Sequence, residues 1–480
     1  MKFYTIYIFL FLSWQSVAQQ NYWVKTQDLD FFSKSYPSIK EISHSKWLDM
    51  SVFTLNKEQV EAFKIDSNVL ELIPVRMLES TNVNEGSNID FGTYVFSLSQ
   101  LGSDRLHKQG FNGSGVKIGI VDAGFANANT DVALTHVFQG EQIAGINDFR
   151  SFEDTNFYSK NFFGDYHGRK VFRRIAGVKD SEFLGAATNA TFYLSISENN
   201  GHERQLEEFA WIEALEWFYS KGVRLVNSSL GYADRFDDDS ENYKLSDMDG
   251  NTAIISRAAK IAVEEKGMII VNSMGNEGNK DWEYVVAPAD VEGVISVGAT
   301  KKNSLKVDYS SIGIENGDFI KPDVVCYARK GTSFSAPYIT GLIAQLLQYD
   351  NTLSNAEVKT ILEQSSNLYP FKNNYVGYGI PNGERALSLI KGETLKYDTL
   401  TVSVKSELKL NLDFECEKLN LFHKKNKSDV IEQLHVDFGL KSKHDIKLKK
   451  GNKLYLRRPN KKVEYTTVDL YSKVIEVNWK

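Results

Sequence analysis

The segment Gly-Thr-Ser-Phe-Ser-Ala-Pro at residues 331–337, with the apolar run behind it, constrains the fold of this chain most strongly. The apolar residues of that run recur at helical spacing, which predicts a buried helix; they are Ile339, Leu342, Ile343 and Leu346. Proline is tolerated only in the first turn of a helix, so Pro337 places the start of this helix near Ser333.

The position of Ser333 allows two interpretations. At a helix start, backbone N–H groups and the positive end of the helix dipole favour a negative charge. A hydroxyl at such a position is either a helix cap or a nucleophile. A nucleophile also needs a general base, an orienting acid and an oxyanion donor, so the rest of the chain has to decide between the two.

Size and composition exclude some classes of protein. The 480 residues leave room for two or three domains and one large core. A net charge of −6 argues against nucleic acid as the main partner. The only cysteines, Cys326 and Cys416, lie far apart and define neither a disulfide framework nor a metal pattern. We interpret Cys326 as a buried apolar residue close to the Ser333 loop.

The first residues have the character of an export signal. A basic start, an apolar run at residues 3–14 and the small residues Ser16 and Ala18 predict a signal peptide over residues 1–18, cut after Ala18. The run is too short to span a bilayer comfortably, and we expect no integral membrane segment later in the chain. The mature protein is therefore expected outside the cytoplasm, whether extracellular, at the cell surface or periplasmic.

Two parts follow the signal before the sequence pattern changes again. Residues 19–96 comprise a small α/β unit, with strands expected at residues 47–55 and 69–75, and an exposed linker rich in Ser, Asn, Asp and Gly at residues 79–91. Residues 97–392 alternate strands and helices. This alternation predicts an α/β fold with a mostly parallel sheet covered on both faces.

The last part, residues 393–480, reads as a separate β-rich domain because several of its segments alternate like half-exposed strands. It carries more Lys and Arg than Asp and Glu, although the whole chain is acidic. A solvated face is the simpler explanation of this basic character. Contact with a cell surface or a polyanion is the alternative.

Polar side chains follow three of the predicted core strands. Buried strands are expected at residues 116–121, 190–196, 223–229, 268–272 and 294–298, with helices at residues 205–221 and 252–265 and a capping box at Ser354 to Glu357. Asp122 ends the first of these strands, Ser229-Leu230-Gly231 ends another, and Asn276 follows a third within Gly-Asn-Glu-Gly. In an open α/β sheet, functional groups gather beyond the carboxyl ends of the strands. Taken singly, Asp122 could be a strand-end cap and Asn276 a turn residue.

The missing general base must be a histidine, since that side chain exchanges protons readily near neutral pH. His167 stands in Gly-Asp-Tyr-His-Gly, just before an apolar run at residues 171–178 that a helix would explain. The other seven histidines lie in the N-terminal unit, in the tail, ahead of the core sheet or in polar loops. A lone histidine is more often structural, so His167 is a candidate because of the residues that accompany it.

The order Asp122, His167, Asn276 and Ser333, with the local sequence around each, resembles the subtilisin-like (subtilase, S8-type) serine peptidases of the secreted bacterial type. The resemblance covers roughly residues 100–389, and Gly-Thr-Ser-x-Ser-Ala-Pro and Gly-Asn-Glu-Gly carry it most specifically. It implies a subtilisin-like three-layer α/β fold. It also implies that the small α/β unit in front is an inhibitory propeptide that assists folding.

The resemblance implies a role for each of these residues. Ser333 would attack a peptide carbonyl, His167 would take and return the proton, and Asp122 would orient the imidazole. Asn276 and the backbone N–H of Ser333 would hold the oxyanion. Ser229-Leu230-Gly231 would form the edge along which an extended substrate binds.

We therefore predict a secreted serine endopeptidase that is made as a zymogen and hydrolyses peptide bonds through an acyl-enzyme. Its partners would be protein or peptide substrates and its own propeptide, and no cofactor would be required. The alternative is a catalytically impaired binding protein with the subtilase fold, for which the basic tail would supply contacts.

Two features depart from the family pattern. Arg169 stands where the family has threonine, and a positive charge beside the imidazole would oppose its protonation. The segment at residues 326–330 replaces a longer hairpin. Because this segment leads to Ser333, its length affects how the site is aligned.

Two acidic segments have a composition that could suit Ca²⁺, namely Asp237-Asp238-Asp239 and residues 247–250. Neither supplies a full set of ligands, so we interpret both as solvated acidic loops and leave a calcium site unsupported.

Overall fold

The computed structural model describes residues 19–75, 91–149, 157–159, 166–198, 207–234, 242–315, 317, 319–412, 418–437, 444–449, 463–471 and 473–480. Its contacts divide the chain into two compact units after Val75, and each unit has its own apolar core. The predicted signal peptide and nearly all of the predicted linker lie outside the described residues. Within the described ranges, no helix is long and apolar enough to cross a membrane.

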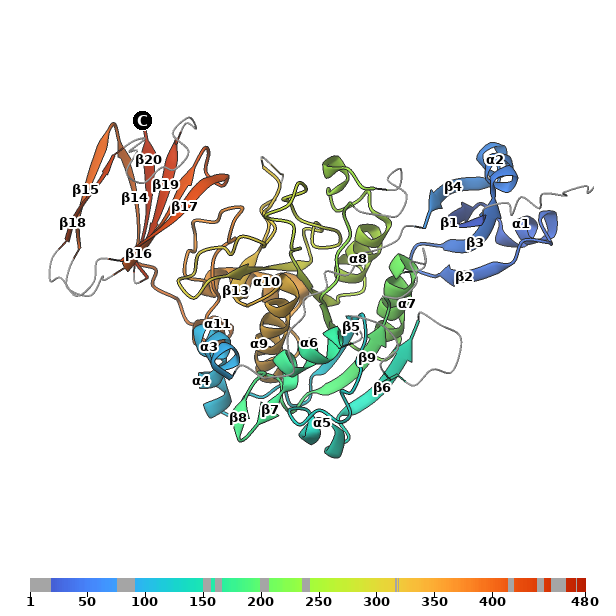
Figure 1. Ribbon diagram of the computed structural model, residues 1–480, viewed down its shortest axis with the longest axis horizontal. Helices are drawn as coiled ribbons and strands as arrows, with labels where there is room; N and C mark the ends of the chain where they lie inside the picture. Colours follow the sequence, from blue (N-terminus) through green and yellow to red (C-terminus); the bar gives the residue numbers. More distant parts are fainter. Residues whose placement is uncertain are drawn as a thin grey trace, which may run out of the picture. The chain divides into compact units, whose positions relative to one another are not determined.

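The N-terminal unit is a four-stranded sheet with two helices (Figure 1, blue). Its elements are β1 (Gln19–Thr26), α1 (Leu29–Ser35), β2 (Glu41–Ser45), β3 (Met50–Asn56), α2 (Lys57–Ile65) and β4 (Val69–Pro74). The strands expected at residues 47–55 and 69–75 correspond to β3 and β4, and α2 connects them. The sequence did not predict β1, which pairs antiparallel with both β3 and β4 and so completes the sheet.

A seven-stranded parallel sheet forms the centre of the larger unit, in the order β13-β12-β11-β10-β5-β9-β6 (Figure 1). Every pairing in it is parallel. The strands are β5 (Lys117–Asp122), β6 (Ile143–Asp148), β9 (Thr191–Ile196), β10 (Leu225–Ser228), β11 (Ile269–Ser273), β12 (Ile295–Thr300) and β13 (Val324–Tyr327). The predicted α/β fold with a parallel sheet is confirmed, and the five predicted core strands differ from the observed ones by only a few residues at their ends.

Helices cover the sheet in two groups. On one side, α6 (His167–Ala176) packs against α9 (Ala336–Tyr349), and on the other α7 (Glu207–Ser220) packs against α8 (Ile254–Glu264). Strand β5 shows why both faces must be apolar. Ile118 and Ile120 belong to the core cluster that contains α6 and α9, while a Cβ added at Gly119 would lie 2.9 Å from the Phe218 ring of α7. The remaining short elements are α4 (Ser103–Lys108), α5 (Thr135–Gln139), β7 (Val178–Lys179), β8 (Glu182–Phe183), α10 (Asn355–Ser365) and α11 (Gly383–Ile390).

The start of α9 differs from its prediction by three residues. The α-helix begins at Ala336, and a 3₁₀ turn at Thr332–Phe334 precedes it. Gly331 enters this turn with φ of 138°, a conformation that favours glycine, so the chain can change direction sharply before Ser333. The predicted capping box is present: the Ser354 hydroxyl and the Glu357 side chain each accept a bond from the other's backbone N–H.

Helix α3 (Phe91–Leu101) begins before the predicted boundary between residues 96 and 97 and packs with the larger unit. Tyr94, Leu98 and Leu101 lie in the main core, and the Ser97 hydroxyl donates a 2.9 Å hydrogen bond to the Tyr327 carbonyl oxygen. The division between the two compact units therefore falls ahead of this helix.

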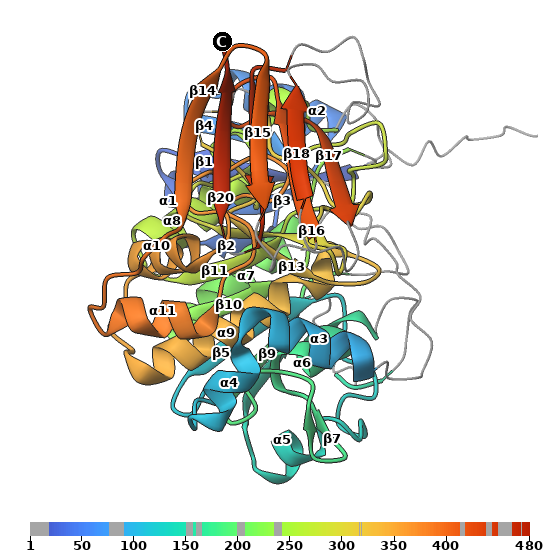
Figure 2. The same ribbon diagram turned by 90° about the vertical axis from the view of Figure 1, so that its left-hand side faces the viewer.

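The C-terminal residues form a five-stranded sheet, in the order β14-β20-β19-β16-β17, and a two-stranded sheet of β15 and β18 (Figure 2, orange and red). The strands are β14 (Thr399–Val404), β15 (Glu407–Leu412), β16 (Lys418–Lys424), β17 (Val430–Asp437), β18 (His444–Lys449), β19 (Tyr465–Asp469) and β20 (Val474–Trp479). These strands have a separate apolar core. Hydrogen bonds also join them to the central part of the larger unit, for example from the Val430 N–H to the Asn374 side-chain oxygen at 2.9 Å.

Candidate active site

The sheet order brings the predicted polar groups to one edge. Strands β5, β10 and β11 are neighbours, and Asp122, Ser229 and Asn276 come at or just after their carboxyl ends. Ser333 reaches the same edge through the turn after β13, because its carbonyl oxygen accepts a 3.0 Å hydrogen bond from the Ser229 hydroxyl. Residues separated by some two hundred positions in the chain thus meet at one place.

Asp122 and His167 form the closest polar pair at this edge. Nδ1 of His167 lies 2.6 Å from Oδ1 of Asp122, whose side chain is fully buried, whereas the imidazole is 13 % exposed. A carboxylate can only accept hydrogen bonds, so Nδ1 carries the proton of a neutral imidazole and Nε2 remains as the acceptor. Oδ1 of Asp122 also accepts the Ala123 N–H at 2.8 Å, which fixes the carboxylate.

Glycine at position 168 permits this close approach. His167 is the first residue of α6, the helix that includes most of the apolar run at residues 171–178, and Gly168 packs directly against the turn after β5. A Cβ at Gly168 would lie 2.6 Å from the Gly124 carbonyl oxygen and 3.0 Å from Cβ of Asp122. Any other residue would push the helix start away from the strand and lengthen the pair between His167 and Asp122.

Ser333 lies beside this pair but does not hydrogen-bond to it in the part of the chain that the structure describes. Its hydroxyl donates instead to the Ser229 carbonyl oxygen at 3.2 Å, and the residue is 4 % exposed. The ring of Phe334, the next residue, stacks on the His167 imidazole with 5.3 Å between centroids. A hydrogen bond between a nucleophile and its general base is often long or absent until substrate binds.

Thr332 fixes the side chain of Asn276. Its backbone N–H and its hydroxyl both donate to Oδ1 of Asn276, at 2.8 and 3.0 Å. With the amide oxygen held on that side, the amide nitrogen of Asn276 points away from Thr332. Thr332 was not among the predicted site residues, although its place directly before Ser333 could have suggested it.

Phe334 has a second neighbour, the buried guanidinium of Arg174, whose Cζ lies 3.9 Å from the ring centroid. Arg174 is anchored by a 2.9 Å hydrogen bond to the Lys170 carbonyl oxygen. The ring therefore touches both a cation and the imidazole, which limits how far His167 can move. Neither Phe334 nor Arg174 was predicted, because nothing in the sequence marks an aromatic residue as a support for a histidine.

Arg169, the first departure from the family pattern, pairs with a carboxylate. Its Nε lies 3.5 Å from Oδ2 of Asp131, and its guanidinium lies 4.7 Å from the centroid of the Tyr166 ring. The same Asp131 oxygen accepts a 2.6 Å hydrogen bond from Arg173. Arg169 lies two residues after the start of α6, and its positive charge is paired with the carboxylate of Asp131.

The short connection at residues 326–330, the second departure, is anchored at its middle. Cys326 is fully buried in β13, as predicted, and the Tyr309 hydroxyl donates to the Ala328 carbonyl oxygen at 3.0 Å. Burial raises the pKa of Tyr309 to about 12, so the phenol stays protonated and remains a donor. Beside this connection lies an open cavity of about 360 Å³ that Tyr327, Lys330 and Lys302 help to line.

A group of buried acids lies near Asp122. Glu198 follows β9, and Glu207 and Glu208 open α7. Burial raises the pKa of Glu198, and the charges of Glu207 and Asp122 raise it further. A neutral Glu198 adds no second negative charge beside Asp122. Nothing in the sequence marks these glutamates as buried, because buried and exposed acids look alike in a sequence.

Of the two acidic segments considered for calcium, the structure describes only residues 247–250. Asp237-Asp238-Asp239 lies outside the described residues. Asp249 accepts the N–H groups of Asn251 and Thr252 at 2.8 and 2.7 Å and the Thr252 hydroxyl at 2.8 Å, so it shapes the turn that leads into α8. Within the described ranges, no three His, Cys, Asp or Glu residues are grouped to hold a metal ion.

The fold and the arrangement at this edge define the subtilisin-like serine peptidases. The sequence profile described as "Subtilase family" (Peptidase_S8) matches residues 113–379, more than half of the chain, and the chain belongs to this family. It is a subtilisin-like serine endopeptidase.

Curated relatives and solved structures agree with this assignment. The chain is 26 % identical over 359 residues to subtilisin NAT of Bacillus subtilis subsp. natto, covering 71 % of this chain and 81 % of the relative. It is 27 % identical over 307 residues to subtilisin DY of Bacillus licheniformis, covering 61 % and 98 %. The fold is similar to that of fervidolysin from Fervidobacterium pennivorans (TM-score 0.57, 17 % identity, 88 % and 68 % covered). It is also similar to that of the epidermin leader peptide processing serine protease from Staphylococcus aureus (TM-score 0.56, 15 % identity, 78 % and 100 % covered).

Proposed function

We propose that this protein is a secreted endopeptidase, made as a zymogen, that cleaves peptide bonds with Asp122, His167 and Ser333. The single observation that carries the proposal is the 2.6 Å pair between the buried carboxylate of Asp122 and Nδ1 of His167. The His167 ring stacks on the ring of Phe334, the residue directly after Ser333. A pair of this kind holds the imidazole in the tautomer whose Nε2 can take a proton.

The reaction follows from these positions. Ser333 Oγ attacks the carbonyl carbon of the substrate while His167 Nε2 takes its proton, and Asp122 stabilises the imidazolium that forms. The imidazolium then gives the proton to the leaving amine, which departs and leaves an acyl group on Ser333. Water repeats the sequence with His167 as base again, which releases the acid product and restores the hydroxyl.

Charge on the attacked oxygen needs donors at the place where it develops. The amide nitrogen of Asn276, turned by Thr332, and the backbone N–H of Ser333 would supply them. A donor of this kind contributes about 10²–10³ in turnover, the scale measured for the corresponding asparagine of a subtilisin.

The substrate would bind as an extended strand along Ser229, Leu230 and Gly231. Ser229 ties this edge to the nucleophile, because its hydroxyl binds the Ser333 carbonyl oxygen and its own carbonyl oxygen accepts from Ser333. Main-chain hydrogen bonds along such an edge supply affinity, and pockets for the side chains supply specificity.

Residues 1–18 would direct export, and the compact unit that ends at Val75 would act as the inhibitory propeptide. A separate core supports this division, because a unit that folds around its own apolar residues can be cut off without exposing the core of the rest.

The test is N-terminal sequencing of the secreted protein together with a digestion assay on an unfolded protein substrate. The wild type should lose residues 1–75 or more and digest the substrate, whereas Ser333→Ala should keep the N-terminal unit and digest nothing. Identical processing in both, without digestion by either folded protein, would favour the binding-protein alternative.

A further inference from the structure

The turn that carries Asn276 is held by Ser311, a residue of the segment between β12 and β13. The Ser311 N–H donates to the Gly275 carbonyl oxygen at 3.1 Å, and the Ser311 hydroxyl accepts the Glu277 N–H at 3.0 Å. Gly275 and Glu277 are the two neighbours of Asn276 in the chain. Ser311 therefore fixes the backbone on both sides of the proposed oxyanion donor.

Two residues shortly before Ser311 fix this segment in turn. The Tyr309 carbonyl oxygen accepts the Gly278 N–H at 2.9 Å, so it holds the far end of the same turn. Lys306 is 5 % exposed, and burial lowers its pKa to about 8, which leaves the ammonium charged at neutral pH. The ammonium donates to three carbonyl oxygens, those of Val307 at 3.1 Å, Asp308 at 3.3 Å and Ser310 at 2.7 Å. The chain between Lys306 and Ser311 is thus closed on itself, and the position of Lys306 sets where Ser311 lies.

The C-terminal sheet holds the backbone of Lys306. Gln433 of β17 accepts the Lys306 N–H with its side-chain oxygen at 2.9 Å and donates to the Lys306 carbonyl oxygen from its side-chain nitrogen at 2.8 Å. Two bonds of this kind to one residue fix it as a paired residue of a neighbouring strand would. Asn420 of β16 also donates to the Asn303 carbonyl oxygen at 3.0 Å. The segment that supports the turn around Asn276 is therefore itself supported by the C-terminal sheet.

We propose that the C-terminal β domain helps to position the active site and that Gln433 is a positioning residue, which acts through Lys306 and Ser311 on Asn276. The inference rests on the proposed function, because it assumes that Asn276 stabilises the oxyanion. A donor of this kind has to be held within about 0.5 Å of its productive place. Maturation of the enzyme must then spare the C-terminal domain.

The reaction decides which kinetic constant should respond. The substrate would bind along residues 229–231, which take no part in the contacts between Gln433 and Asn276. Charge on the attacked oxygen develops only in the transition state, so a misplaced Asn276 lowers kcat and leaves KM nearly unchanged.

The first test is Gln433→Met, which keeps the length of the side chain and removes both bonds to Lys306. With a peptide p-nitroanilide, and with active sites counted by fluorophosphonate titration, we expect kcat to fall about 10-fold and KM to stay within about twofold of the wild type. Gln433→Glu retains an acceptor for the Lys306 N–H and should lose less. It replaces the methionine variant if that variant fails to fold.

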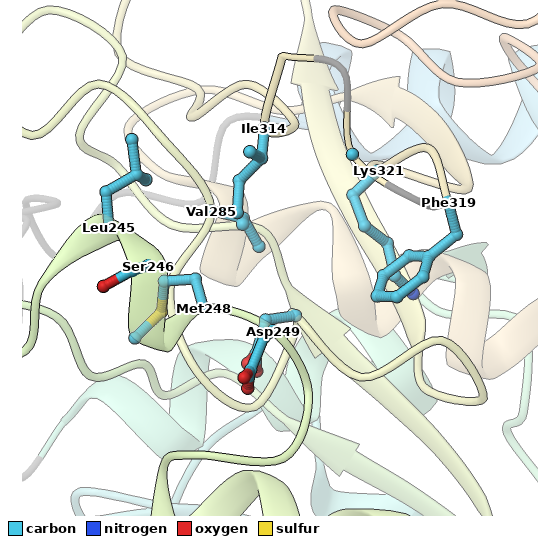
Figure 3. Close-up of a pocket in the computed structure, with 10 residues that line it drawn as sticks. Leu245, Ser246, Met248, Asp249, Val285, Ile314, Phe319 and Lys321 are labelled. Atoms are coloured by element: carbon cyan, nitrogen blue, oxygen red, sulfur yellow. The ribbon is translucent and has the colours of Figure 1, made fainter.

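Lys425 offers a matched control, because it joins the C-terminal domain to the larger unit at another place. Its ammonium pairs with the carboxylate of Glu315. The neighbouring Ile314 helps to line a cavity of about 210 Å³, shown in Figure 3. This pair takes no part in the contacts that lead from Gln433 to Asn276, so Lys425→Met should leave kcat and KM within about twofold of the wild type.

A double-mutant cycle with Asn276→Ala separates positioning from a general loosening of the site. Asn276→Ala should itself lower kcat by about 10²–10³-fold. In that variant no donor remains to be misplaced, so adding Gln433→Met should lower kcat by less than about twofold.

The possible failures are distinguishable. An unchanged kcat in Gln433→Met, an equal loss in Lys425→Met, or the same 10-fold loss in the Asn276→Ala background would overturn this inference and leave the proposed function standing. So would a mature enzyme that has lost β16 and β17 and keeps full turnover. A folded wild type that hydrolyses no peptide and whose Ser333 resists a fluorophosphonate would overturn the proposed function and this inference with it.

Discussion

Asp122 and Asp323 are both buried carboxylates on the central sheet, yet their surroundings differ sharply. Asp323, next to β13, accepts from the Ser296 N–H and hydroxyl, both at 2.8 Å, and from the ammonium groups of Lys321 and Lys359, both at 2.9 Å. Asp122 has one imidazole and one backbone N–H on Oδ1, and its Oδ2 has no hydrogen-bond partner among the residues that the structure describes.

The difference separates a carboxylate that stabilises the fold from one that can do chemistry. Burial alone would raise the pKa of Asp323, but the ammonium groups of Lys321 and Lys359 outweigh it and lower this pKa to about 2. Burial lowers the pKa of Lys321 to about 8, against the attraction of Asp323, so both groups are charged at neutral pH. Among the described residues no such fixed cation pairs with Asp122, and it can therefore respond to a charge that appears and disappears on His167.

The largest expected effect comes from removing the charge of Asp122. Asp122→Asn should lower kcat by about 10⁴-fold, because the amide offers His167 a donor and favours the wrong tautomer. The melting temperature should change little, since few bonds depend on this carboxylate. A variant with kcat within tenfold of the wild type would remove the distinction between the two aspartates.

The matching change at the other carboxylate should affect stability and leave activity alone. Asp323→Asn leaves the buried Lys321 ammonium without its carboxylate, and we expect the free energy of unfolding to fall by about 3–5 kcal/mol. Urea unfolding measures the loss. Turnover per folded molecule, determined by active-site titration at low temperature, should stay within about threefold of the wild type. A large loss of turnover would show that Asp323 also supports the site.

The dependence of stability on pH sharpens the comparison. The folded pKa of Asp323, about 2, is below the unfolded value of about 3.9, so the stabilisation is complete above pH 4 and is lost as the pH falls toward 2. The loss should be about 2 kcal/mol in unfolding free energy over this range. Asp323→Asn should show a shallower decline between pH 4 and 2, and an equally steep one in both proteins would contradict this assignment.

The smallest expected effects come from removing one hydroxyl group at the candidate active site and one beside Asp323. Thr332→Val removes a hydrogen bond to Oδ1 of Asn276 and should lower kcat by about tenfold, with an unfolding free energy close to that of the wild type. Ser296→Ala removes a hydroxyl that donates to Asp323 and should cost about 1 kcal/mol of stability without changing kcat. Equal effects of the two changes on both measurements would argue that the two places do not differ in kind.

Much of the fold was predictable because the spacing of the apolar residues and the residues that begin or end helices and strands agree with it. The core strands are apolar throughout because helices cover both faces: in β5, Ile118 and Ile120 face α6 and α9, and Gly119 faces α7. The extent of the N-terminal sheet was missed because β1 carries polar residues such as Gln19, Gln20 and Asn21, which mask its strand character. The start of α9 was placed at Ser333 because a proline limits a helix start only to within one turn.

For the candidate site, the sequence could nominate residue types and their order along the chain. It could not show that Ser333 donates to Ser229, that Phe334 stacks on His167, or that Asp131 partners Arg169. Each of these contacts joins residues far apart in the sequence or depends on a side-chain rotamer.

The account depends on Ser333 being activated by His167 and Asp122, and covalent labelling tests this most directly. The secreted protein is treated with a fluorophosphonate at neutral pH, and the modified residue is mapped by mass spectrometry in the wild type and in His167→Ala. We expect a single adduct on Ser333 of the wild type, and a rate of labelling lower by at least about 10³-fold in the variant. No adduct on a folded and processed wild type, or equal rates in the two proteins, would contradict the account.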